Sequence, residues 1–361
     1  MSVKYDSLIV FGSAVSPPLA AGKYKARCSM AEKLSAALND SDPVVSVIIP
    51  SYNTAHLIVE TLTSVFAQTF RMLEVIVVND GSPDSEVLEQ VLRPFIDRIT
   101  YLRQRNEGLA AARNAGIRAA RGHYLALLDS DDLWLPTFLE SQIAFLRANP
   151  QFDLVYSDAE FFGDTPRAGQ RFTALSPSTG PVTLESLLSL RCTVVASSVV
   201  AKKSVFMNVG MFDPTHRACA EDWECWTRLV KGGVRIGYQR EALIRYRIRS
   251  SSLSANRSAM QEGALLALSK LEALGPLAPA EERAATRFRN LFESELELER
   301  GKRHLADATY PAARGSFLAV AKQHPSRKVR WKGWCLVLGL TVAPAITRLV
   351  ANRAQTTGTQ H

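Results

Sequence analysis

The chain has 361 residues, of which 47% are hydrophobic and 22% are charged. These fractions are typical of globular proteins, so wholesale disorder is excluded, and the length predicts one large domain with an appendage. The net charge is +8, but residues 301–361 carry ten Lys or Arg against a single acid, Asp307. Because the basic charge belongs to the tail, no nucleic-acid partner is expected for the main domain.

Residues 1–43 show weak periodicity and are treated as an extension of unknown role. Their apolar stretch SLIVFGSAV is short, follows Asp6 and ends at Pro17, so no signal peptide is predicted. The five cysteines are odd in number, scattered and without a CxxC pair. We therefore expect neither a disulfide framework nor a zinc site, and a reducing, cytoplasmic compartment is the simpler interpretation.

From residue 44 onward, short β-branched runs alternate with stretches of helical periodicity. Strands are predicted at residues 44–49, 73–78, 99–104 and 124–129, and helices at residues 56–66, 85–95 and 109–121. This alternation predicts parallel βαβ units in a doubly wound sheet with helices on both faces.

The pattern is more mixed after Pro136. We predict a helix to residue 148, strands at 153–158 and 193–203, and a Gly- and Pro-rich loop at 163–181. A helix ended by Gly232 and Gly233 and a helical region at 259–323 are predicted to follow. We divide the chain into an extension (1–43), an α/β domain (44–255) and a helical C-terminal region (256–361).

Polar loops follow three of the predicted strands. PSYN (50–53) follows the first strand, NDGS (79–82) the second and DSDD (129–132) the fourth. Ligands of such sheets bind beyond the carboxyl ends of the strands, so we expect these loops to meet at one edge.

The DSDD loop places three carboxylates, Asp129, Asp131 and Asp132, in four positions. Two carboxylates about 4 Å apart repel by roughly 4 kcal/mol at an effective dielectric of about 20, and a divalent cation removes that cost. Mg²⁺ or Mn²⁺ binds through one or two carboxylates together with substrate phosphates. The alternative is that these residues cap a helix beginning near Leu133, which one Asp can do and three cannot.

Five motifs, VSVIIPSYN, VIVVNDGSPD, GLAAARNAGI, LALLDSDDLWLP and EDWECWTRL, resemble those of family 2 glycosyltransferases with the GT-A fold. Their order and spacing match over residues 43–254, more than half of the chain. The resemblance implies an inverting, metal-dependent transfer of a sugar from a nucleotide diphosphate sugar, most often UDP-linked. The implied acceptor is a hydroxyl of a glycan or a lipid-linked molecule, as in cell-surface polysaccharide synthesis.

The resemblance also implies roles for matching residues. Asp80 would accept a hydrogen bond from the base, Asp129 would hold the ribose, and Asp131 would bind Mn²⁺ or Mg²⁺ with support from Asp132. The implied nucleotide-sugar-binding residues are Pro50, Tyr52, Asn53, Asp80, Arg113, Asp129 and Ser130. The open alternatives are a turn role for Asn79 and a solvated helix charge for Arg113.

A second acidic site, Glu221-Asp222, precedes WECWTRL. An inverting transfer needs a base on the face opposite the leaving diphosphate, and the family pattern makes Asp222 that base, with Glu221 and Trp223 in support. The alternative is acidic charge at a helix N-terminus. Trp223 and Trp226 either stack on a sugar or belong to the core.

Two positions depart from the family pattern. Glu224 stands where many relatives have Asp, and Arg249, in YRIRSSSLS, stands where His is common. Arg249 would then act as a phosphate-binding cation, which puts metal ligation beyond DSDD in doubt.

The C-terminal region contains a basic cluster followed by 15 uncharged residues, 333–347, interrupted by Pro344. A spanning helix needs about 20 apolar residues, so none is expected. Basic residues beside Trp331 and Trp334 suit a helix lying on an anionic membrane surface, and the alternative is a helix packed on its own domain.

Two other functions stay open from the sequence. A nucleotidyltransferase would show a Gly-rich loop after the first strand, where PSYNTAHLI has no glycine, and no GxGxxG or P-loop motif occurs. A non-catalytic sugar-nucleotide binding module would have lost its reactive residues, whereas Asp129, Asp131 and Asp222 are present.

Overall fold

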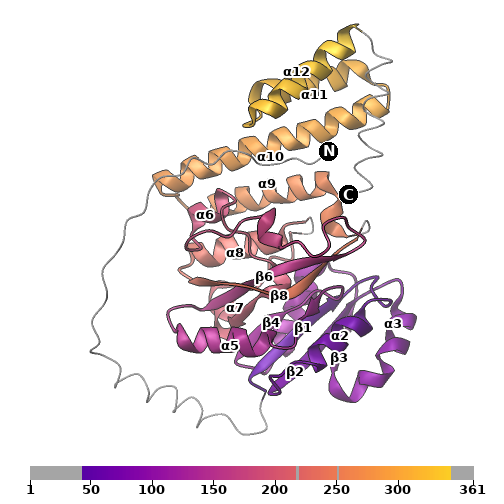
Figure 1. Ribbon diagram of the computed structural model, residues 1–361, viewed down its shortest axis with the longest axis vertical. Helices are drawn as coiled ribbons and strands as arrows, with labels where there is room; N and C mark the ends of the chain where they lie inside the picture. Colours follow the sequence, from indigo (N-terminus) through magenta and orange to yellow (C-terminus); the bar gives the residue numbers. More distant parts are fainter. Residues whose placement is uncertain (1–42, 217–218, 250–251, 343–361) are drawn as a thin grey trace, which may run out of the picture. The chain divides into compact units, whose positions relative to one another are not determined.

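The structure is a computed structural model that describes residues 43–216, 219–249 and 252–342 (Figure 1). By its contacts the chain divides into Met1–Asp42 and Pro43–His361, and every described residue lies in the second unit. The predictions for residues 1–42 and for the tail beyond residue 342, Pro344 included, lie outside the described residues.

The unit is built on a mixed sheet of eight strands with the order β3-β2-β1-β4-β7-β6-β8-β5. Neighbours are parallel from β3 to β4, whereas β7 is antiparallel to both β4 and β6. The strands are β1 (Val45–Ser51), β2 (Leu73–Asp80), β3 (Thr100–Gln104), β4 (Tyr124–Leu127), β5 (Leu133–Trp134), β6 (Leu154–Gly163), β7 (Val200–Lys202) and β8 (Ile236–Ile248). The expected mostly parallel, GT-A-like sheet is confirmed.

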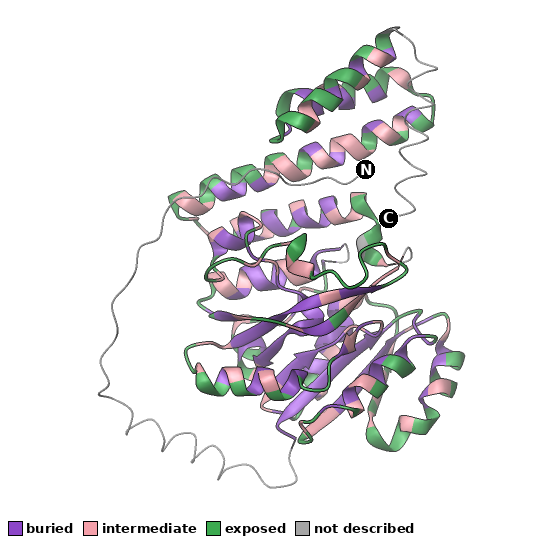
Figure 2. Cartoon of the chain, viewed as in Figure 1, coloured by how far each residue is buried: buried purple, intermediate pink, exposed green. Residues whose placement is uncertain are grey.

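Helices cover both faces of the central sheet, and β1 is therefore buried along its whole length (Figure 2). The helices are α2 (Ile58–Phe66), α3 (Ser85–Leu92), α4 (Leu109–Ala119), α5 (Phe138–Ala148), α6 (Leu184–Leu188), α7 (Lys203–Val209), α8 (Glu221–Lys231), α9 (Arg257–Ala273), α10 (Pro279–Ala306), α11 (Tyr310–Gln323) and α12 (Arg327–Val342). Gly116 lets α4 lie close on β1, since a Cβ there would be 2.4 Å from Cγ2 of Ile48.

The C-terminal region forms successive helices, and α9 lies between α8 and α10 (Figure 1). The predicted helical stretch at 259–323 is three helices, because Gly275 and Pro276 separate α9 from α10 and residues 307–309 separate α10 from α11. An apolar cluster joins α6 to α9 and α10, and a second cluster joins α10, α11 and α12 through Leu305, Phe317 and Val337.

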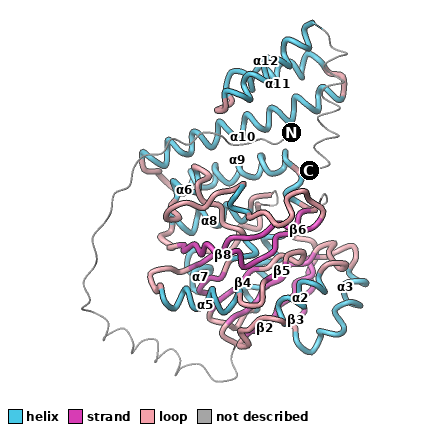
Figure 3. Tube along the Cα trace, in the orientation of Figure 1, coloured by secondary structure: helices cyan, strands magenta, loops and turns pink. Residues whose placement is uncertain are grey.

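Two local predictions differ from the structure (Figure 3). Most of the strand predicted at 193–203 is irregular: a 3-10 turn at Ala196–Ser198 precedes the short strand β7. No helix starts near Leu133, because Leu133–Trp134 forms β5 and pairs with β8, and α5 begins at Phe138. The helix-capping interpretation of DSDD is therefore wrong.

Candidate active site

The three polar loops meet at one edge of the sheet, as predicted. The register places Ser51 level with Asn79, and Ile48 level with Leu127. The Thr54 and Ser130 hydroxyls lie 2.8 Å apart and join the first loop to DSDD. The backbone N–H of Asn53 donates to Ser82 Oγ at 2.6 Å and joins the first loop to NDGS. The buried Ser130 is thus held by the hydroxyl of Thr54 from the first loop.

Asp80 is buried at the end of β2 and organises the start of α4. Its carboxylate accepts hydrogen bonds from Gln104 Nε2 at 2.8 Å and from the backbone N–H groups of Glu107 and Gly108 at 2.9 Å each. An ionised carboxylate has about four acceptor sites, so capacity for a base remains.

Asn79 is a turn residue, as its alternative interpretation held. Its Oδ1 accepts from the backbone N–H of Ser82 at 2.9 Å, and its Nδ2 donates to Ser85 Oγ at 3.0 Å. The neighbouring first loop exposes the ring of Tyr52, while Pro50 is buried in β1 and Asn53 has a left-handed φ of 55°. An exposed aromatic face at this edge suits stacking on a flat ring.

Arg113 connects the two acidic motifs. Its side chain is 1% exposed, and it donates to Asp129 Oδ1 at 2.8 Å and to Glu221 Oε1 at 2.6 Å. Burial alone would lower its pKa, but attraction to Asp129, Glu221 and Asp222 raises it. The interpretation of Arg113 as a solvated helix charge is wrong.

The DSDD carboxylates face Arg247 of β8 and Arg249, which follows the end of that strand at Ile248. Oδ2 of Asp131 accepts from Nε and Nη2 of Arg249 at 2.9 and 2.6 Å, and Oδ1 of Asp132 accepts from the backbone N–H of Arg247 at 2.8 Å. Burial and then repulsion from Asp129 raise the pKa of Asp131. Burial and repulsion from Asp131 raise the pKa of Asp132 well above its ordinary value. Attraction to Arg249 opposes the shift at Asp131, so the arginine partly offsets the repulsion within the cluster.

Asp222 lies in the first turn of α8, close enough to Asp129 and Arg113 for their charges to act on it. Burial, followed by repulsion from Glu221, raises the pKa of Asp222 to about 7. A carboxylate with this pKa accepts a proton near neutral pH, as a general base must.

The loop that leads into Asp222 is held by the C-terminal region. Ala220 has a left-handed backbone with a φ of 72°, which strains a residue with a Cβ. On α9, Gly263 lies directly on this loop, because a Cβ there would be 1.8 Å from the carbonyl oxygen of Cys219.

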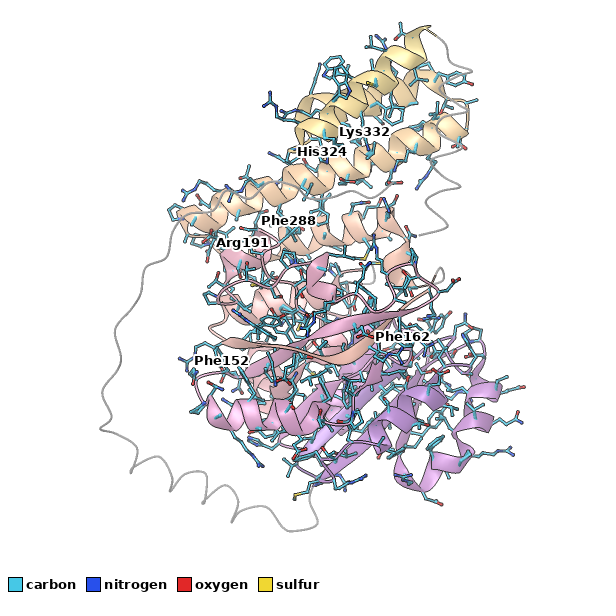
Figure 4. All side chains as sticks on the ribbon, in the orientation of Figure 1. Phe152, Phe162, Arg191, Phe288, His324 and Lys332 are labelled. Carbon is cyan, nitrogen blue, oxygen red and sulfur yellow. The ribbon has the colours of Figure 1, made fainter. Side chains whose placement is uncertain are left out.

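The two tryptophans of α8 differ in burial: Trp226 is buried and Trp223 is partly buried. Trp226 is 1% exposed, and Trp223 stacks on Phe288 of α10 with ring centroids 4.6 Å apart (Figure 4 labels Phe288). Trp226 therefore belongs to the core, and the stacking of Trp223 joins α8 to α10.

Comparison with known proteins identifies the family. Residues 46–194 match the model of Glycosyl transferase family 2. The chain is 31% identical over 221 residues, 60% of its length and 81% of the relative, to "UDP-Glc:alpha-D-GlcNAc-diphosphoundecaprenol beta-1,3-glucosyltransferase WfgD" of Escherichia coli. The chain belongs to glycosyltransferase family 2.

Solved structures agree with the GT-A fold of this family 2 domain. Staphylococcus aureus TarS 1-349 in complex with UDP has a TM-score of 0.54 at 17% identity, covering 87% of this chain and 91% of TarS 1-349. A mannosyltransferase of Pyrobaculum calidifontis in complex with GDP-Man and Mn²⁺ has a TM-score of 0.56 at 21% identity, with 87% of each chain covered.

Some family 2 relatives are much longer than this chain. An uncharacterized glycosyltransferase of Rickettsia bellii is 32% identical over 61% of this chain, yet the match spans only 32% of that relative. The match to the family model ends at residue 194, before Asp222 and Arg249.

The DSDD loop of this family 2 domain fits a divalent cation. Its donors are carboxylate oxygens, the class that Mg²⁺ and Mn²⁺ prefer, and the pKa values of Asp131 and Asp132 are raised first by burial and then by repulsion from neighbouring carboxylates. No cluster of three His, Cys, Asp or Glu suited to a metal occurs among the described residues. One or two carboxylates suffice when a diphosphate supplies further ligands. Asp131 would hold the ion, with one oxygen already bound by Arg249.

Two residues of the site escaped the sequence analysis. Arg247 donates through Nε to the backbone oxygen of Asp131 at 2.7 Å and through Nη2 to Glu60 at 2.7 Å. Its guanidinium also lies 4.3 Å from the ring centroid of Phe162, which Figure 4 labels. The sequence could have indicated Arg247, because it lies two residues before Arg249 and residues two apart share one face of an extended chain. For Glu60, a lone acid on α2, no such signal exists.

Proposed function

We propose that this chain transfers a sugar from a nucleotide diphosphate sugar, with UDP as the favoured nucleotide, to a hydroxyl of a glycan or lipid-linked acceptor. The configuration at the anomeric carbon inverts. The juxtaposition of Asp129 and Glu221-Asp222 around the buried Arg113 carries the proposal, because it brings the donor loop and a base together.

The donor would lie along the edge of the sheet. Tyr52 stacks on the base, Asp80 accepts a hydrogen bond from it, and Asp129 binds the ribose. Arg249 and Asp131 lie where the diphosphate follows. The chemistry that a Mg²⁺ or Mn²⁺ ion supplies when bound to Asp131 is neutralisation of the diphosphate's negative charge.

Asp222 takes the proton of the reaction. The acceptor oxygen forms a bond to the anomeric carbon while the bond from that carbon to the phosphate oxygen breaks. The diphosphate leaves with the electron pair, and the hydroxyl proton moves to the Asp222 carboxylate. Arg113 fixes Glu221 beside Asp222, and burial together with repulsion from Glu221 holds the pKa of Asp222 at about 7.

The names of relatives support a lipid-linked acceptor and a place in cell-surface polysaccharide synthesis. WfgD carries an acceptor of diphosphoundecaprenol type in its name. We place the reaction at the cytoplasmic face of a membrane, where nucleotide sugars and lipid-linked acceptors meet. A non-catalytic binding module is less well supported, since it would not need Asp222 with a pKa of about 7.

Nucleotide binding and turnover test the proposal. Calorimetric titration with UDP, GDP and dTDP, with and without Mn²⁺, should give tight binding of one nucleotide, strengthened by Mn²⁺ and weakened in Asp131→Asn. Asp222→Asn should keep nucleotide binding yet lower sugar transfer to a polyprenyl-diphosphate-linked sugar by about 10²- to 10⁴-fold. The exposed Asp97→Asn is the matched control. Unchanged turnover in Asp222→Asn would remove the base from the mechanism, and a folded protein that binds no nucleotide would refute both the proposed transfer and the binding-module alternative.

A further inference from the structure

Helix α12 is apolar on two opposite faces. One face packs on α11 through Gly333, Val337 and Leu340. The contact is close, since a Cβ on Gly333 would lie 2.9 Å from the backbone N of Ala321. This face accounts for the stability of α12, because burial of an amphipathic face holds most helices in place.

The opposite face of α12 is exposed and carries large apolar side chains. Trp331 is 70% exposed, Trp334 is 42% exposed and Leu338 is 61% exposed. Spacings of three and four residues place them on one side of the helix, and Cys335 is exposed beside them. An exposed apolar stripe of this size marks an interaction surface.

Cations surround this stripe. Arg327, Lys328 and Lys332 are exposed on α12, and Figure 4 labels Lys332. Neither α11 nor α12 contains an acidic residue. The surface is therefore apolar in its centre and positive at its margin.

We propose that this exposed face of α12 docks on an anionic lipid surface. Tryptophan rings and the stems of Lys and Arg suit the boundary between headgroups and acyl chains, while the cations attract anionic headgroups. No helix within the described ranges is both long and apolar enough to cross a bilayer, so α12 lies on the surface. A second copy fits less well, because it would bring cations against cations.

If the proposed function holds, docking would also bring the enzyme to its acceptor. A chain held at the membrane surface meets a lipid-linked acceptor in two dimensions rather than three. The surface property itself is independent of catalysis, so vesicle binding and nucleotide binding are measured on the same preparation. Vesicle binding without nucleotide binding would refute the proposed function alone, and the converse would refute docking alone.

Vesicle co-sedimentation of the full chain tests the docking. Vesicles of equal parts phosphatidylglycerol and phosphatidylcholine should bind the protein, pure phosphatidylcholine should bind it weakly, and high salt should release it. Lys328→Ala/Lys332→Ala should weaken binding about 30-fold, given about 1 kcal/mol per cation. Arg283→Ala/Arg287→Ala, an exposed pair at the same spacing on α10, should leave binding unchanged.

The apolar stripe has its own variant and control. Trp331→Ala/Trp334→Ala should weaken vesicle binding at least about tenfold, whereas Val87→Ala/Met207→Ala, also exposed, should not. All four side chains are exposed, so folding is expected to survive, as circular dichroism will check. Docking would be refuted if the protein did not bind anionic vesicles at low salt, or if the control variants lost as much binding as the test variants. If the protein instead self-associated, and Trp331→Ala/Trp334→Ala abolished that association, the exposed face would bind a second copy.

Discussion

Single residues set the chemistry of the site, and Arg113 shows how. Its guanidinium holds Asp129 of the donor loop and Glu221 of α8 within one buried ion-pair network. Removing one partner of such a network leaves buried charge uncompensated, at a typical cost of about 3 to 5 kcal/mol. The motifs singled out Arg113, Asp129 and Glu221 as candidate site residues. The sequence could not predict that Arg113 joins the two acids, because Asp129 and Glu221 lie 92 residues apart in the chain.

Activity should depend on the protonation of Asp222. Its pKa is raised to about 7, so the carboxylate is protonated, and inactive as a base, below that pH. We expect kcat/KM to rise with pH up to about 7 and then to level off. Glu221→Gln removes the repulsion between Glu221 and Asp222 and should move the rise in kcat/KM to lower pH. Glu241→Gln, at an exposed position on β8, should leave the pH profile unchanged. If the rise in kcat/KM occurred at the same pH in Glu221→Gln as in the wild type, Asp222 would not be the titrating base.

Metal dependence should be set by Arg249. The guanidinium occupies one oxygen of Asp131, the carboxylate expected to bind the ion. Arg249→His removes that competition and supplies a neutral imidazole ligand, so Mn²⁺ should strengthen UDP binding more in this variant than in the wild type. Calorimetric titration at several Mn²⁺ concentrations measures this. An equal Mn²⁺ effect in both proteins would mean that Arg249 does not compete with the ion.

At the scale of elements, periodicity predicted most of the first half of the chain but missed pairings between distant segments. The strands and helices up to α5 follow the predicted order because local apolar patterns encode them. The two-residue strand β5 exists only because β8 lies beside it, with Leu133 level with Arg245. The same pairing presents Arg247 and Arg249 to DSDD, so this part of the site depends on tertiary contacts that no local pattern contains.

The contact of α9 with the loop before Asp222 should govern turnover. Gly263→Ala would force the Cys219 carbonyl away from α9, because a Cβ there would lie 1.8 Å from that oxygen. A shift of about 1 Å in a catalytic group can cost about 100-fold in rate, so kcat should fall by ten- to a hundredfold with little change in UDP affinity.

Gly315→Ala on α11 is the matched control for that variant. No atom lies within 4 Å of a Cβ at this position, and alanine stabilises helices over glycine by about 1 kcal/mol. This control should therefore keep its turnover and gain thermal stability. If Gly263→Ala retained full kcat, α9 would not position the base.

At the scale of the whole molecule, helix α6 of the α/β domain and the C-terminal helices α9 and α10 share one apolar cluster. Leu184 and Leu188 of α6 pack with Leu268 of α9 and Phe288 of α10. The domain boundary near residue 255 stays a prediction. Because the apolar cluster contains residues from both sides of this boundary, we expect the α/β domain and the C-terminal helices to unfold together. The sequence showed helical periodicity after residue 259 but not the surface that those helices cover.

Phe288→Ala tests this coupling. Phe288 is 2% exposed and stacks on Trp223, so its truncation should lower the free energy of unfolding by about 3 to 5 kcal/mol. Leu266→Ala, partly exposed on α9, should change it by less than about 1 kcal/mol. Urea denaturation should show one transition followed equally by tryptophan fluorescence and circular dichroism. Two separate transitions in the wild type would instead support independent units on either side of residue 255.

The stack of Trp223 on Phe288 limits how this protein can be recombined with its relatives. Trp223 directly follows Asp222, so the ring that fits the C-terminal helices and the carboxylate proposed as the base share one helical turn. A graft of foreign helices joined after β8 would place a new surface against Trp223 and tilt that turn. An engineer who wishes to exchange acceptor preference should therefore transplant α8 together with α9 and α10.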